Sequence, residues 1–192
     1  MAEPMVEVFI YETRQFLDQL EQISMGSEES GEFSTEDVNE IFRAMHTIKG
    51  SAAMMMFEEI STLAHSVEDI FYYIRELHPK IVDSTAITDI VLNAVDFMRI
   101  EMDKLDSGTT PDASSQELRD YTKDFLRNMK LANGDDPDMD LRKAKNKGGG
   151  AKKQAPKQFY IPSAPAAPEP AEAPIVPELS KAAGGDDVKE TK

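Results

Sequence analysis

Hydrophobic residues recur every three or four positions in five stretches between residues 4 and 131, and polar residues fill the positions between them. This spacing places apolar side chains on one face of a helix, so the pattern predicts five amphipathic helices. No stretch alternates in the way that a half-buried strand does. The predicted helices are Pro4–Met25, a second starting at Ser34, Phe57–Leu77, Asp83–Leu105, and a fifth after Pro111.

The hydrophobic positions also predict which side chains of each helix face the core. The first helix is expected to turn inward Met5, Phe9, Phe16, Leu20 and Ile23. The inward set of the second helix is Val38, Ile41, Met45, Ile48 and Ala52. For the fifth helix the predicted set is Leu118, Tyr121, Phe125 and Met129.

Capping signals mark several of the expected ends. The run 34–37, Ser-Thr-Glu-Asp, resembles a capping box and starts the second helix, after a polar linker at 26–33. A second such box is predicted at 114–117 for the fifth helix. His78-Pro79 ends the third helix, because the residue before a proline disfavours helical geometry.

Short connections between successive helices make neighbours antiparallel, so we expect an all-α antiparallel bundle of four core helices with a fifth C-terminal helix. The helical pattern stops near residue 135. Residues 142–158 hold seven Lys or Arg and no acidic residue, and seven of the eleven prolines lie within 156–177. We therefore predict a folded domain over 1–134 and a disordered tail over 135–192, basic at first and then a Pro/Ala-rich linker. The basic run is expected to be a solvated linker, and contact with the acidic bundle or with a partner is the alternative.

The charge of the chain limits the classes of molecule that it is expected to bind. Residues 1–141 carry 30 acidic and 11 basic residues, which argues against binding nucleic acid by the folded part. The acidic surface suits a basic partner or serves solubility alone. There is no cysteine, so thiolate metal sites and disulfides are excluded. Without a signal segment or a long apolar run, we expect a cytoplasmic protein with no membrane contact, and a monomeric domain.

One of the three histidines, His46, lies at the edge of an apolar face, one position beyond Met45. Gly50 follows one turn later, inside a helix, where glycine costs about 1 kcal/mol relative to alanine. It either leaves the imidazole accessible or permits close helix packing. If the second and third helices form a hairpin that turns near residues 56–57, Glu68 and His65 lie at the height of His46 and Lys49.

That arrangement predicts a specific chemistry. A carboxylate of Glu68 that accepts the proton of one ring nitrogen leaves the other nitrogen of His46 with an exposed lone pair. This is the general form of a nucleophile oriented by a second group. Lys49 is expected to add positive charge where a phosphoryl group would sit. Glu68 and Lys49 could equally belong to ordinary solvated helix faces.

The segment IFRAMHTIKGSAAMMMF, residues 41–57, resembles the phosphoacceptor motif of histidine phosphotransfer (HPt) domains. More closely, it is similar to the N-terminal domain of CheA-type chemotaxis histidine kinases. LAHSVEDIF at 63–71 and FIYETRQFLDQLE at 9–21 resemble the neighbouring helices of that domain. The similarity covers residues 5–131. One departure is Met56, where many relatives have glycine.

The resemblance implies that His46 is phosphorylated on the nitrogen distal to the backbone and that Glu68 binds the other nitrogen. It makes Lys49 and His65 the polar surround and Gly50 the small residue that opens access. The partners would be a histidine kinase domain, which holds ATP and magnesium, and CheY- or CheB-like response-regulator receivers. No cofactor is expected in this chain itself.

No nucleotide-binding motif occurs in the sequence, so whether the chain counts as an enzyme stays open. The tail favours a piece of a longer kinase over a stand-alone phosphorelay protein. A di-metal carboxylate bundle would need Glu-x-x-His pairs, whereas only the reversed His65-x-x-Glu68 occurs. A Ser/His/Asp hydrolase lacks a nucleophile elbow. A helical interaction module without chemistry remains the main alternative.

Overall fold

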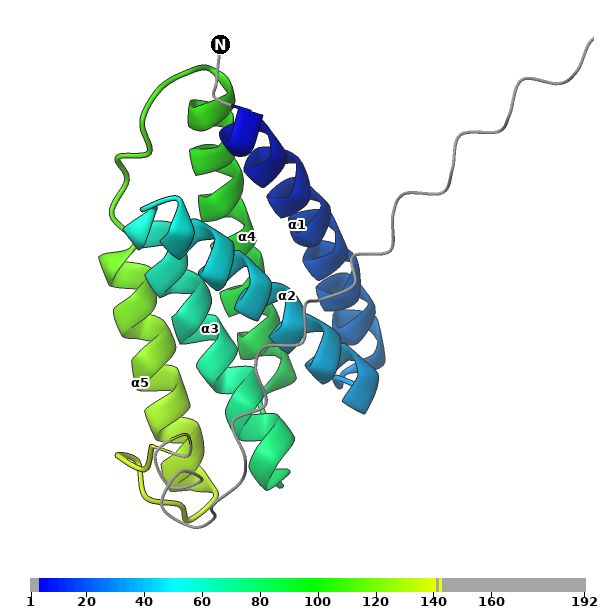
Figure 1. Ribbon diagram of the computed structural model, residues 1–192. Helices are drawn as coiled ribbons and strands as arrows, with labels where there is room; N and C mark the ends of the chain where they lie inside the picture. Colours follow the sequence, from blue (N-terminus) through cyan, green and yellow to red (C-terminus); the bar gives the residue numbers. More distant parts are fainter. Residues whose placement is uncertain (1–3, 141, 143–192) are drawn as a thin grey trace, which may run out of the picture. The chain divides into compact units, whose positions relative to one another are not determined.

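The computed structural model describes residues 4–140 and residue 142. Five helices account for most of this part of the chain, and no strand occurs in it (Figure 1). The helices are α1 Pro4–Ser30, α2 Thr35–Met54, α3 Glu58–Leu77, α4 Ser84–Asp106 and α5 Gln116–Ala132. The all-α prediction is confirmed.

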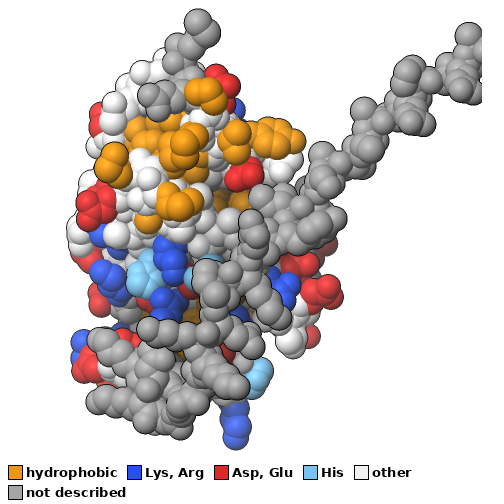
Figure 2. Space-filling view, in the orientation of Figure 1, with side chains coloured by type: hydrophobic (Ala, Val, Ile, Leu, Met, Phe, Trp, Pro, Cys, Tyr) orange, Lys and Arg blue, Asp and Glu red, His pale blue; other side chains and the backbone are white. Residues whose placement is uncertain are grey.

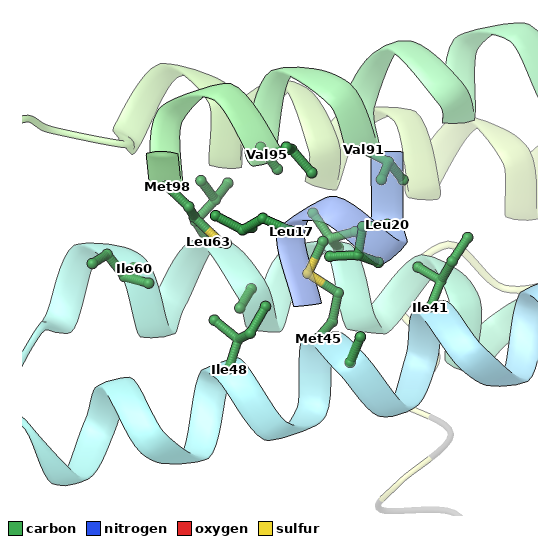
Figure 3. Packing of buried hydrophobic residues seen from close by; sticks show 14 of the residues in the cluster. Leu17, Leu20, Ile41, Met45, Ile48, Ile60, Leu63, Val91, Val95 and Met98 are labelled. Carbon is green, nitrogen blue, oxygen red and sulfur yellow. The ribbon is translucent and has the colours of Figure 1, made fainter. Parts of the chain in front are cut away.

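The helices form a bundle in which α2 packs against α3, α1 against α4, and α5 against α3 (Figure 1). The three residues between α2 and α3 reverse the chain, so these two helices are antiparallel neighbours. Side chains from α1, α2, α3 and α4 converge on one hydrophobic interior (Figure 3). The residues labelled there are Leu17, Leu20, Ile41, Met45, Ile48, Ile60, Leu63, Val91, Val95 and Met98. All five residues predicted to face inward on α2 are buried.

Helix α1 departs from the prediction in length and in orientation. It continues through Gly26 to Ser30, because the polar residues Ser24 and Ser27 lie buried and extend the packed face beyond Met25. Met5 is 70% exposed, and Leu17, not Phe16, is fully buried. Of the predicted set, Phe9 and Leu20 are buried and Phe16 and Ile23 are partly buried against the core, so the prediction is wrong at Met5. It also missed Leu17 and the small hydroxyl side chains that complete the face.

The predicted start of α2 is confirmed. The amide of Asp37 donates to Ser34 Oγ at 3.1 Å, and the amide of Ser34 donates to Asp37 Oδ2 at 2.8 Å. This reciprocal pair satisfies two of the amides that a helix N-terminus leaves without intrahelical partners. Local sequence therefore determines where α2 begins, and α2 carries His46.

The predicted capping box of α5 is wrong. Helix α5 begins at Gln116, and the Ser115 hydroxyl donates across the bundle to the Glu59 carboxylate at 2.7 Å. The Ser115 amide donates to the same carboxylate at 2.7 Å. These two hydrogen bonds lower the pKa of Glu59. Tyr121 was predicted to face inward but is 54% exposed, since α5 packs mainly on α3 and covers the bundle from one side.

The chain after α5 stays on the bundle as far as it is described. Asn133 receives a hydrogen bond from the Ile81 amide and donates to the Ile81 carbonyl, and the Tyr73 hydroxyl donates to Asp135 Oδ2 at 2.6 Å. Most of the predicted tail, residue 141 and residues 143–192, lies outside the described residues. Within the described part, no helix combines the length and apolarity that crossing a membrane requires.

Candidate functional site

His46 projects from the exposed edge of α2, and its side chain is 51% exposed. Its neighbour Met45 is completely buried, so the core fixes the helix beneath the ring. The Phe42 ring, one turn earlier, lies parallel to the imidazole with the centroids 6.0 Å apart and 21° between the planes. The imidazole is therefore supported on one side and open to solvent on another.

The facing helix supplies the partner of the imidazole. Glu68 on α3 accepts a hydrogen bond from His46 Nδ1, with Oε1 2.9 Å from the nitrogen, and the glutamate side chain is only 2% exposed. An ionised carboxylate can only accept, so the proton resides on Nδ1 and Nε2 keeps its lone pair. Within residues 4–140 and 142, no group forms a hydrogen bond with Nε2.

Glu68 is ionised despite its burial. Burial by itself raises the pKa of its carboxyl group, but contacts from Lys49 and His46 and the charges of Lys49 and Arg142 outweigh that effect. The net result is a pKa below the ordinary value for glutamate. A charged acceptor therefore faces His46 across neutral pH.

Lys49 lies close to both Glu68 and the imidazole of His46. Its Nζ is 2.6 Å from Glu68 Oε2, an ion pair, and 3.4 Å from His46 Nδ1. The ammonium group thus sits beside the nitrogen that carries the proton. Its side chain is 23% exposed, because the buried carboxylate draws it inward. That Lys49 adds positive charge where a phosphoryl group would sit stays a prediction, because the contacts of Nζ are with Glu68 and with the Nδ1 edge of the ring.

His65 is not brought into contact with His46. Its Nε2 lies 2.7 Å from Arg142 Nη1 and 3.7 Å from Asp69 Oδ1. An arginine can only donate, so the neutral ring accepts at Nε2 and carries its proton on Nδ1. His65 joins the site through Arg142, on the far side of Glu68.

Gly50 lies exposed on the same face of α2 as His46. A Cβ atom built on it would meet no other atom within 4 Å. The glycine is therefore not required for packing one helix against another, and the space beside His46 is open. This agrees with the first of the two interpretations of Gly50.

Arg142 is the part of the site that sequence reasoning missed. Its Nη2 lies 3.1 Å from Glu68 Oε1 and 2.9 Å from Asp69 Oδ1, and its guanidinium carbon is 5.1 Å from the centre of the Tyr72 ring. The expectation that the basic run is solvated from its first residue is wrong at this position. Residue 142 is far from 68 in the chain, and no local pattern indicates that the two meet.

Histidine side chains lie next to lysine and arginine side chains on one face of the molecule, and exposed hydrophobic side chains gather on the same face (Figure 2). The most exposed large hydrophobic residues include Met5, Met54 and Met56. Met56 has a φ of 60°, a left-handed conformation that glycine adopts without strain. This explains why a glycine would suit that turn, as the resemblance indicated.

Comparisons with known proteins agree with this architecture. The family model described as "Hpt domain" matches residues 4–108. The chemotaxis protein CheA of Borreliella burgdorferi is 31% identical over 124 residues, which are 65% of this chain and 14% of that protein. The chain thus corresponds to a small part of this relative's length.

Two solved structures share the fold. The solution structure of the histidine phosphotransfer domain of CheA is 30% identical, with a TM-score of 0.55, over 65% of this chain and 93% of that one. The phosphorylated P1 domain of CheA3 from R. sphaeroides, solved in complex with CheY6, has a TM-score of 0.55 at 24% identity, over 63% of this chain and 94% of that one. The chain belongs to the Hpt domain family, through its residues 4–108.

Proposed function

We propose that His46 accepts a phosphoryl group on Nε2 from an ATP-bound kinase domain and passes it to an aspartate of a response regulator in chemotaxis signalling. One observation carries the proposal: a buried, ionised Glu68 holds the proton on Nδ1, while Nε2 is unbonded among the described residues on a half-exposed ring. That combination makes Nε2 the accessible nucleophile.

The first transfer forms one bond to phosphorus and breaks another. The Nε2 lone pair forms a bond to the γ-phosphorus of ATP, the bond from that phosphorus to the bridging oxygen breaks, and ADP leaves. The imidazole then carries a positive charge, with its proton still on Nδ1. Glu68 Oε1, 2.9 Å away, stabilises that charge as it develops.

In the onward transfer the ring nitrogen is the leaving group instead of the nucleophile. A carboxylate oxygen of the receiver bonds to phosphorus as the bond from phosphorus to Nε2 breaks, and the ring returns to its neutral form. The open space at Gly50, one turn from His46, leaves room for a receiver to approach the ring. Among the proteins to which the chain is similar, one P1 domain was solved with a CheY protein.

The proposed donor and acceptor are separate proteins or domains. The acidic folded part, with 30 acidic and 11 basic residues in 1–141, favours partners with basic surfaces. We propose that ATP and magnesium are bound by the kinase domain as co-substrate and metal, and that this chain supplies the accepting nitrogen alone.

The experiment is phosphorylation of the purified chain by a CheA-type kinase core with labelled ATP and magnesium. We expect label that is lost in acid and retained in base, as for a phosphorus–nitrogen bond. Nitrogen-15 NMR of the product should place phosphorus on Nε2. His46→Gln should abolish the labelling while leaving the helical circular dichroism unchanged, because the ring is outside the core.

His78→Asn is the matched control. His78 lies at the C-terminal end of α3 in a left-handed conformation that asparagine also adopts. The variant should be labelled like the original chain. Label that survives His46→Gln, or that is lost equally in both variants, would reject His46 as the acceptor.

A further inference from the structure

The segment that follows α5 is anchored at several points, so Arg142 reaches the site from a defined direction. Gly134, with φ at 81°, turns the chain after α5. Lys130 Nζ donates to the Met139 carbonyl at 2.9 Å, and the Arg142 amide donates to Asp140 Oδ1 at 3.0 Å. Together with the hydrogen bond from Tyr73 to Asp135, these contacts hold residues 135–140 near α3 and α5.

The guanidinium of Arg142 bridges three acceptors on α3. Nη2 contacts Glu68 and Asp69, and Nη1 contacts His65 Nε2 at 2.7 Å. Nη1 is within hydrogen-bond distance of His65, whereas Nη2 makes ion pairs with the two carboxylates, at 3.1 Å and 2.9 Å, and forms no hydrogen bond among the described residues. The side chain is 33% exposed, so it lies at the edge of the site and is not part of the core.

The contact with Glu68 matters because the two oxygens of that carboxylate have different tasks. Oε2 pairs with Lys49, and Oε1 is shared between His46 Nδ1 and Arg142 Nη2. Without Arg142, Oε1 would keep His46 Nδ1 as its donor but lose a nearby positive charge, and a buried carboxylate with fewer cationic partners is held less firmly and takes up a proton more readily. Arg142 keeps Oε1 turned toward the imidazole.

We propose that Arg142 is a positioning residue for phosphotransfer, which fixes Glu68 so that the proton of His46 stays on Nδ1. This inference rests on the proposed function of His46. It extends the functional unit beyond α5 and beyond residue 108, where the family match ends. It also gives the start of the basic run a task within the domain.

The test uses the full chain with Arg142→Gln, Arg142→Lys and a matched control, Arg127→Gln. Arg127 is exposed on α5, and no hydrogen bond or ion pair joins it to another described residue. Both glutamine variants therefore lose one positive charge near the same end of the molecule. Thermal unfolding of each variant shows that the bundle is intact.

Two readouts separate positioning from packing. Nitrogen-15 NMR of the unphosphorylated chain should show a smaller share of the Nδ1–H tautomer of His46 in Arg142→Gln, and a changed tautomer ratio for His65. The initial rate of phosphorylation should fall about tenfold. Arg142→Lys should recover most of the rate but not the His65 spectrum, and Arg127→Gln should alter neither.

Unchanged His46 and His65 spectra in Arg142→Gln would overturn the proposal, because Arg142 would then not hold this network in solution. A faster rate in that variant would also overturn it and assign Arg142 a blocking role. If the original chain is not labelled at all, the proposed function fails, while the NMR comparison still tests the placement of Arg142.

Discussion

Glu68 on α3 and Glu101 on α4 are both almost completely buried, yet their surroundings differ in kind. Glu101 pairs with Lys104, one turn along its own helix, at 2.6 Å, and that lysine also binds Asp112 on the surface. The partners of Glu68 come from outside its helix: His46 and Lys49 on α2, and Arg142.

The comparison teaches that burial of a carboxylate does not by itself make a reactive site. Among residues 4–140 and 142, the partner of Glu101 is a single cation that holds no lone pair, so the pair can do no more than balance charge. At Glu68 the carboxylate determines which nitrogen of a half-exposed ring carries the proton. The chemistry arises where a buried charge meets a titratable group at the rim of the helix pair.

The largest expected difference between the two glutamates is in phosphotransfer. Glu68→Gln should slow phosphorylation of His46 on the order of 10²-fold, since a neutral amide no longer stabilises the charged ring. Glu101→Gln removes an equally buried charge far from α2 and should leave the rate unchanged. Initial rates with a CheA-type kinase core measure both. Equal rates in the two variants would contradict the role of Glu68.

Stability should show the opposite ranking. Replacing Lys104, the partner of Glu101, should cost more than replacing Lys49, the partner of Glu68. Lys104→Met leaves Glu101 without a cation among the described residues, whereas Lys49→Met leaves Glu68 with Arg142 and His46. An uncompensated buried charge is the costlier defect. The midpoint of thermal unfolding at neutral pH should therefore fall further in Lys104→Met. A larger fall in Lys49→Met would show that Arg142 does not compensate Glu68.

A smaller effect is expected in the pH dependence of stability. Burial raises the pKa of Glu68, but its cationic and hydrogen-bonding partners lower it more, so its folded pKa lies below the reference value of 4.5. A depressed folded pKa contributes stability that is present above the unfolded pKa and is lost as the pH falls through the folded pKa.

The free energy of unfolding, measured in urea between about pH 3 and pH 7, should thus decline less steeply below about pH 4.5 in Glu68→Gln than in the original chain. The comparison between the two chains isolates Glu68 from Glu59 and Glu21, whose pKa values are also lowered. A steeper decline in the variant would show that the sign is wrong.

The smallest effect concerns the exposed rim between α1 and α4. Arg99 contacts Asp18 at 2.8 Å and Glu21 at 2.6 Å, and both carboxylates are open to solvent. Such pairs contribute about 1 kcal/mol or less and weaken as salt is added. Arg99→Gln should lower the free energy of unfolding by no more than that, and the difference should shrink in high salt. A loss above about 2 kcal/mol would mean that this rim supports the core.

Much of the bundle could be predicted because its signals are local. The capping box at Ser34 and the apolar face of α2 depend on residues within one or two turns of each other. The register of the α2–α3 hairpin follows from its short turn, so the meeting of His46 with Glu68 could also be predicted. Where the signals were not local, as at Ser115, the prediction failed, because a serine that suits a cap was engaged by Glu59 on another helix.

The amino-acid sequence alone determined the helices, the edge position of His46 and the height at which Glu68 faces it, because each depends on helical period and one short turn. Only the tertiary structure decided the buried face of α1, the position of Lys49 beside Nδ1 and the approach of Arg142. These three features depend on which surfaces the bundle leaves open and on the need to balance the buried charge of Glu68. Both conditions arise only when segments far apart in the sequence pack together.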